Sequence, residues 1–197
     1  MKKFELVTDM SISFLGRKLF RIRALVDFTT KWGDTIKAGG LGGYVEKEEN
    51  LSHEGNAWVS GNARVFGNAW VSGNARVFGN ARVSGNAWVS GNAEVSDNAR
   101  VFGNARVSGN ARVFGDARVY DANHVLTVGP IGSRNATTTF FRDKNNEITV
   151  VCGCFLGNIE DFLKKVEETH GDNKHAKAYQ AAAELAKIQI DLTKEEE

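Results

Sequence analysis

One six-residue phrase, Gly-Asn-Ala-x-Val-x, repeats eleven times in unbroken register between Gly55 and Tyr120, with an aspartate replacing one corner residue in two copies. Such a period constrains the fold strongly, because units this short bury a core only by stacking on one another. Within each copy, Ala and Val are two residues apart, so in an extended segment both point inward and the residue between them points outward. The Gly-Asn pair predicts a corner, because both residues tolerate left-handed backbone. The phrase therefore predicts a β-helix.

The phrase resembles the hexapeptide repeat of left-handed β-helix proteins, a fold found in many trimeric acyltransferases. In that family, three hexads form one triangular coil of about eighteen residues. Segments 23–28, 40–45 and 50–52 also resemble the entry into the helix in a group of bacterial and phage proteins labelled as transferases. The resemblance covers roughly residues 21–126. It implies a left-handed coil and self-assembly into a homo-oligomer, with a trimer favoured.

The segment before the array predicts a cap for the first coil. Residues 4–13 and 18–28 alternate apolar and polar side chains on either side of a Leu-Gly-Arg turn, which is typical of a β-hairpin. A cap is required because an open terminal coil exposes unpaired backbone groups. Tyr44-Val45 and Asn50-Leu51 resemble degenerate first hexads, and the register slips by two residues near His53.

The segment after the array predicts a second cap of mixed structure. The phrase decays after Tyr120 and is broken at residues 129–132, Gly-Pro-Ile-Gly. Strand-like runs at 137–142 and 148–152 predict a hairpin. One helical face follows from Ile159 to near Gly171, after Asn158 as N-cap, and a second over about 173–190.

We therefore predict a mainly β fold with three parts. These are an N-terminal β-hairpin cap (1–38), a single-stranded left-handed β-helix of hexapeptide repeats (39–128), and a C-terminal cap of a hairpin plus two helices (129–197).

Composition limits the classes of function. The net charge of +1 argues against binding to long duplex nucleic acid. The chain start lacks the apolar core of a signal peptide and no apolar stretch is long enough to span a membrane, so we expect a cytoplasmic protein without membrane contact. Cys152 and Cys154 form a lone Cys-x-Cys in an apolar run, which indicates buried free thiols. The spacing of the four histidines predicts no metal site, and no motif predicts a cofactor.

At three hexads per coil, the outward residues separate onto three faces. One mixes charges, one is an unbroken arginine ladder, and one carries tryptophans. These faces are Trp58, Arg76, Glu94 and Arg112; Arg64, Arg82, Arg100 and Arg118; and Trp70, Trp88, Arg106 and His124.

The arginine ladder is the main candidate site. Its members have no acid among them, and Phe66, Phe102 and Tyr120 follow the valines on the same face. Guanidinium groups beside aromatic rings suit a ligand that carries phosphate and stacks a base, such as a nucleotide. The alternative is a solvated arginine stripe that limits aggregation.

The tryptophan face has two interpretations of its own. Trp70 and Trp88, with Arg106, would form an apolar patch typical of a self-interface. Alternatively, the hairpin or the terminal helices cover the indoles. His124 would lie beside Arg106 and is the candidate general base if the protein is an acyltransferase with an acyl-coenzyme A donor.

The loop after the array offers a second candidate site. Ser133, Arg134 and Thr138 follow the glycine-containing stretch at 129–132 and could hold an anion. The loop matches no phosphate-binding fingerprint, and a plain connector explains the same residues.

The leading functional hypothesis is a non-catalytic, oligomeric binding protein that captures a phosphorylated small molecule or nucleotide. One concrete form, suggested by the resemblance to phage proteins, is a phage-encoded sponge against host nucleotide immune signals. The alternatives are a hexapeptide-repeat acyltransferase and a structural β-helix spacer.

Overall fold

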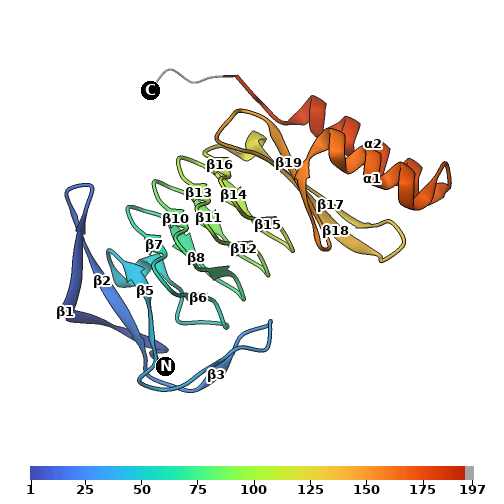
Figure 1. Cartoon of the computed structure of the whole chain (residues 1–197). Coiled ribbons are helices and arrows are strands. Elements are labelled where there is room, and N and C mark those ends of the chain that lie inside the picture. Colours follow the sequence, from blue (N-terminus) through green and yellow to red (C-terminus); the bar gives the residue numbers. More distant parts are fainter. Residues whose placement is uncertain (194–197) are drawn as a thin grey trace.

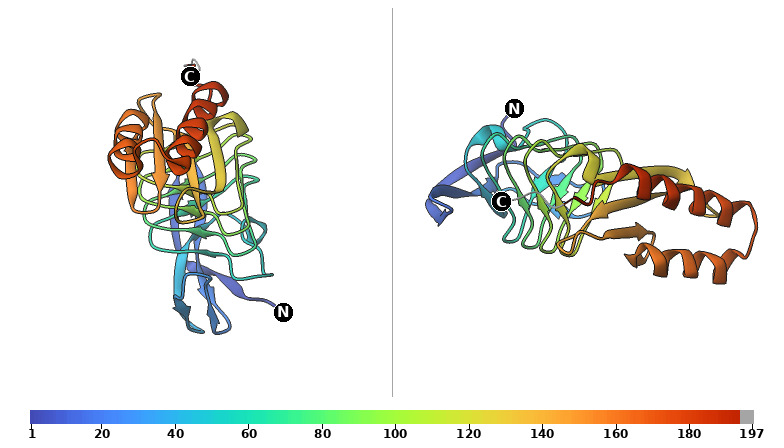
Figure 2. Two further views of the ribbon diagram at one scale, coloured as in Figure 1. Left: turned by 90° about the vertical axis from the view of Figure 1, so that its right-hand side faces the viewer. Right: turned by 90° about the horizontal axis from the view of Figure 1, so that it is seen from above.

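The computed structural model describes residues 1–193. A β-solenoid of about four turns forms the centre of the molecule. The N-terminal strands lie at one end, and a four-stranded sheet with two helices lies at the other (Figures 1 and 2). The protein is therefore mainly β, as the hexads predict.

Each hexad contributes one two-residue strand at its x-Val positions, and strands 18 residues apart pair in parallel, as Arg82 does with Arg64 and Arg100. The strands form three stacked sheets, ordered β7-β10-β13-β16, β14-β11-β8 and β15-β12-β9-β6. The first of them continues beyond β7 into β5 (Leu41–Val45) of the N-terminal part. The solenoid strands are β6 (Trp58–Val59), β7 (Arg64–Val65), β8 (Trp70–Val71), β9 (Arg76–Val77), β10 (Arg82–Val83), β11 (Trp88–Val89), β12 (Glu94–Val95), β13 (Arg100–Val101), β14 (Arg106–Val107), β15 (Arg112–Val113) and β16 (Arg118–Val119).

The repeated Ala and Val side chains fill the solenoid and are buried throughout the array. At the corners, the glycines hold the positive φ, and a Cβ on Gly85 would lie 2.8 Å from the backbone nitrogen of Gly103 in the next turn. The hexad asparagines do not share the left-handed backbone expected of them. Their amides stack between turns instead, as where Asn92 donates to Asn110 over 2.9 Å. The Gly-Asn pair thus combines a backbone requirement with a side-chain ladder.

The N-terminal part begins with an antiparallel hairpin of two long strands, and its last strand, β5, pairs in parallel with β7 of the solenoid. Val45 pairs with Val65, 20 residues away, whereas Val65 pairs with Val83, 18 residues away. The predicted two-residue slip is therefore present. The elements are β1 (Phe4–Phe14), β2 (Arg17–Ala24), β3 (Phe28–Thr29), β4 (Thr35–Ile36), β5 (Leu41–Val45) and the 3-10 helix η1 (Glu48–Asn50).

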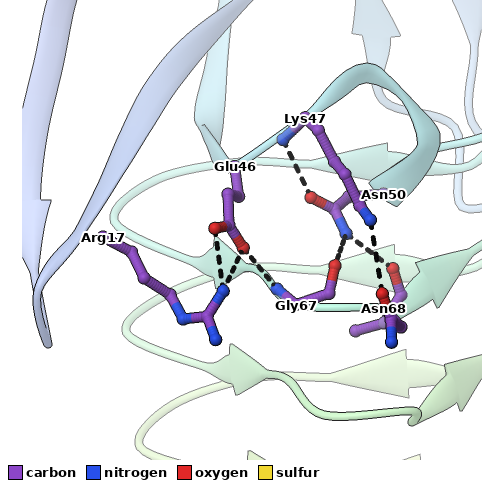
Figure 3. Close-up of polar contacts among 7 residues, drawn as sticks. Arg17, Glu46, Lys47, Asn50, Gly67 and Asn68 are labelled. Carbon is purple, nitrogen blue, oxygen red and sulfur yellow. Dashed lines mark hydrogen bonds and ion pairs between the residues drawn. The ribbon is translucent and has the colours of Figure 1, made fainter.

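Hydrogen bonds made by the charged Glu46 and the buried Asn50 join the N-terminal part to the first solenoid turn (Figure 3). Glu46 accepts hydrogen bonds from Arg17 at 2.8 and 3.0 Å and from the backbone nitrogen of Gly67 at 2.6 Å. The buried amide of Asn50 donates to the carbonyls of Gly67 and Ala69 at 3.1 and 2.8 Å. These bonds satisfy backbone groups at the edge of the first turn.

The C-terminal part has its own core, in which both helices pack on the sheet β17-β18-β19-β20. Asn158 and Asn173 are the N-caps of the two predicted helices. Residues 129–131, where the hexad phrase is broken, continue strand β17 past an irregularity after Val128. The elements are η2 (Ala122–His124), β17 (Val125–Ile131), β18 (Ala136–Arg142), β19 (Ile148–Cys152), β20 (Phe155–Asn158), α1 (Ile159–His170) and α2 (Lys174–Gln189). Among the described residues, no helix has the length and apolar character needed to cross a membrane.

Candidate functional site

The arginine face has the predicted register. Arg64, Arg82, Arg100 and Arg118 pair in order along one parallel sheet. All four side chains are half-buried. Burial, and then the charges of Arg100 and Arg64, lower the pKa of Arg82 from its ordinary value. The ladder thus concentrates positive charge along one side of the solenoid.

An aromatic ring from the N-terminal hairpin covers the lower half of the ladder. The Phe14 ring centre lies 4.3 Å from the guanidinium carbon of Arg64 and 4.9 Å from that of Arg82. Phe14 also meets Phe66 edge to face, with ring centroids 5.8 Å apart. Two of the four arginines therefore already have a cation–π partner within the chain. Sequence reasoning missed this contact because Phe14 is far away in the chain.

The upper three arginines of the ladder, Arg82 included, line a pocket of about 270 Å³. Four cationic side chains line it, against one acid. The lining residues are Asn80, Arg82, Asn98, Arg100, Asp116, Ala117, Arg118 and Lys144.

The turn between β18 and β19 supplies the fourth cation. The backbone nitrogen of Lys144 donates to the carbonyl of Asp116 at 3.1 Å, and its Nζ lies 2.6 Å from the Asp116 carboxylate. Hydrogen bonds from Lys144 and then Asn98 hold the pKa of this carboxyl below its usual value. The turn itself was predicted, but no sequence signal shows that it docks on the last hexad.

The predicted stacking residues do not line this pocket. The ring of Tyr120 lies 5.2 Å from that of Phe102 and 3.9 Å from that of His124. Arg142 donates to the Tyr120 hydroxyl and lies over its ring at 4.8 Å. Tyr120 thus belongs to a side-chain network where the solenoid meets the C-terminal sheet.

The expected place of His124 beside Arg106 is wrong. His124 lies in η2, beyond β14, the last strand of the tryptophan face. It is 2% exposed. Its Nδ1 accepts hydrogen bonds from the backbone nitrogens of Tyr120 and Asp121 at 3.3 and 3.2 Å. A ring buried in this way packs at the end of the solenoid and is almost fully shielded from solvent.

The predicted loop residues Ser133, Arg134 and Thr138 do not line the arginine pocket. Ser133 and Arg134 line a second hollow, of about 370 Å³, between β20, α1 and α2. Thr138 is buried and donates to the Cys152 sulfur at 3.3 Å. Burial, and then Cys152, raise the pKa of Tyr179 in this hollow to about 12. Of the predicted ligand residues, Arg82, Arg100 and Arg118 line the arginine pocket, whereas Ser133 and Arg134 line the second hollow.

The two cysteines differ from the expected buried thiols. Both thiols are free, but Cys154 is exposed and Cys152 is half-buried, so the expected burial is wrong. Cys152 is the last residue of β19, and Cys154 lies in the two-residue connection between β19 and β20. Within residues 1–193, no three His, Cys, Asp or Glu side chains gather as a metal site would require.

The indole rings of the tryptophan face are exposed to solvent. Trp70 and Trp88 are 38% and 44% exposed and meet edge to face with centroids 5.4 Å apart. Arg106, on the next strand, lies over the Trp88 ring at 5.2 Å. The described parts of the terminal segments therefore leave this face uncovered.

Comparison with known families agrees with the solenoid. The YdcK beta solenoid repeat model matches four segments, residues 57–73, 75–91, 93–109 and 105–121. The four segments follow the hexad array from its first copy to its end, so the chain is a β-solenoid repeat protein. A search of curated proteins found no match.

Proposed function

We propose that this β-solenoid repeat protein is a non-catalytic binding protein, and that it captures a phosphorylated small molecule or nucleotide in the pocket on the upper arginine face. The observation that carries the proposal is the charge of that pocket. Arg82, Arg100, Arg118 and Lys144 surround about 270 Å³, with Asp116 as the one acid in the lining.

The chemistry of the lining suits a phosphoryl group. Planar guanidinium groups on adjacent strands offer paired N–H donors that match phosphoryl oxygens. Asn80 accepts from Asn62 over 3.5 Å, which leaves its own amide nitrogen to donate to a ligand. The pocket is at the small end of ligand sites, so it suits a phosphoryl group with a small attached moiety rather than a duplex.

The finer identity of the protein belongs to the same proposal. The hexad phrase supports a left-handed coil of the hexapeptide type, and a phage-encoded sponge for a host nucleotide signal is one biological form of such a protein. The acyltransferase alternative loses its motivating observation because His124 is buried beneath Tyr120 and Arg142.

Calorimetric titration tests the proposal. The ligands are inorganic phosphate, pyrophosphate, adenosine mono- and triphosphate, a cyclic dinucleotide and adenosine. We expect binding of at least one phosphorylated ligand, weaker binding at higher salt, and none of adenosine. Arg100→Gln removes a charged donor and should weaken binding at least about tenfold.

Arg106→Gln is the matched control, because it removes the same charge from the same hexad position on another face. It should leave the affinity within about twofold. Absence of binding to every ligand, or equal losses in both variants, would overturn the proposal.

A further inference from the structure

We infer that the tryptophan face is the surface through which two copies of this chain associate, with their solenoid axes antiparallel. Trp70 and Trp88 occupy adjacent strands and together expose two indole rings on one flat sheet. Exposed aromatic patches of this kind are typical of interface centres. The order of the charges on the same face identifies a second copy as the partner and sets its direction.

The two ends of this face carry opposite charge. Leu51 pairs with Val71, so η1, with Glu48 and Glu49, lies one turn below Trp70. Arg106 lies one turn above Trp88. Within residues 1–193, neither Glu49 nor Arg106 takes part in an ion pair, and both are exposed. Each therefore has a charge that the described chain does not neutralise.

The spacing of these groups is symmetric. Turns lie about 4.8 Å apart, so the η1 turn and the Arg106 turn lie about 7 Å on either side of the midpoint between Trp70 and Trp88. A twofold axis through that midpoint, parallel to the strands, stacks Trp70 against Trp88 of the partner subunit. It also brings Arg106 opposite the acidic η1 of the second copy. One patch thus complements itself, as a twofold interface requires.

A hollow at the acidic end adds to this complementarity. Glu48, Glu49, His53 and Trp70 line an open space of about 530 Å³. Glu48 already pairs with Lys2 and His53, which leaves Glu49 as the available acid for the incoming arginine. A parallel arrangement, including a parallel trimer, would bring Glu49 against Glu49 and Arg106 against Arg106. Like charges opposed at an interface disfavour that assembly.

Sedimentation velocity over a range of concentrations tests association. We expect a concentration-dependent dimer, and at least a tenfold weaker dimer in Trp88→Ala. Trp32→Ala is the matched control, because Trp32 is 40% exposed but lies between β3 and β4, away from this face. It should leave the dimer unchanged. Circular dichroism confirms that each variant remains folded.

A charge exchange tests the direction. Glu49→Arg and Arg106→Glu should each weaken the homodimer at least tenfold, because each opposes two like charges. An equimolar mixture of the two variants restores both pairs in an antiparallel heterodimer and should associate like the original protein. A monomer at all concentrations, a trimer, or a mixture as weak as its components would overturn the inference. None of these outcomes depends on ligand binding at the arginine pocket.

Discussion

Two faces of the solenoid have the same backbone arrangement but differ in whether an acidic side chain neutralises their arginines. On the sheet β15-β12-β9-β6, Glu94 lies between two arginines, with its carboxylate 3.5 Å from Arg76 and 3.2 Å from Arg112. On the arginine face, the corresponding strands carry arginine alone. One substitution within a repeated phrase thus separates a neutralised face from a cationic one.

The terminal segments increase this difference. Asp34, between β3 and β4, lies 2.9 Å from Arg76, and the carbonyl of Gly153 accepts from Arg112 at 3.0 Å. The arginine face receives Phe14, which is neutral, and Lys144, whose ammonium group pairs with Asp116 and not with an arginine partner. The arginines of the first face are therefore neutralised within the chain, whereas those of the arginine face keep a positive charge that an anion can neutralise.

The largest expected effect comes from removing the acid of the neutralised face. Glu94 is 5% exposed, so Glu94→Gln leaves two guanidinium groups against a buried neutral amide. Breaking such a pair should lower the free energy of unfolding by about 2–3 kcal/mol, measured by urea denaturation. Glu147→Gln, at an exposed acid, is the control and should change it by less than about 0.5 kcal/mol. A loss of that small size in Glu94→Gln would show that the pairing does not stabilise this face.

A smaller effect is expected from the aromatic contact on the arginine face. Phe14→Ala removes two cation–π contacts and the edge contact with Phe66, and should lower the free energy of unfolding by about 1–2 kcal/mol. Leu15→Ala, at the 73% exposed neighbour, provides the control. Equal stability of the two variants would mean that Phe14 does not hold the hairpin on the ladder.

The smallest expected effect is a change in the free energy of unfolding whose sign differs between the two faces. Arg100→Gln relieves repulsion with Arg82 and Arg118 and should stabilise the protein by about 0.5 kcal/mol at low salt. Arg112→Gln removes a partner of Glu94 and should destabilise it by about 1 kcal/mol. Urea denaturation at low and high salt measures both. If Arg100→Gln also destabilises the protein, the ladder is not under repulsion.

Much of the solenoid could be predicted because its contacts are periodic. The 18-residue pairing of the arginines, the pairing of Trp70 with Trp88 and the two-residue slip near His53 all follow from counting hexads. The periodicity of the contacts ends where the phrase ends. His124 was placed by extending the count one hexad too far, whereas the chain there turns into η2 and buries the ring.

The repeated Gly, Ala and Val by themselves determined a stacked β-solenoid, because small inward side chains and left-handed corners can bury a core only by stacking. The outward residues determined which charges and rings share a face. Tertiary structure alone decided that Phe14 covers Arg64 and Arg82, that Lys144 joins the upper pocket, and that Tyr120 is held by Arg142. These contacts join residues far apart in the chain, and their geometry depends on how non-repetitive segments dock on the ends of a repetitive one.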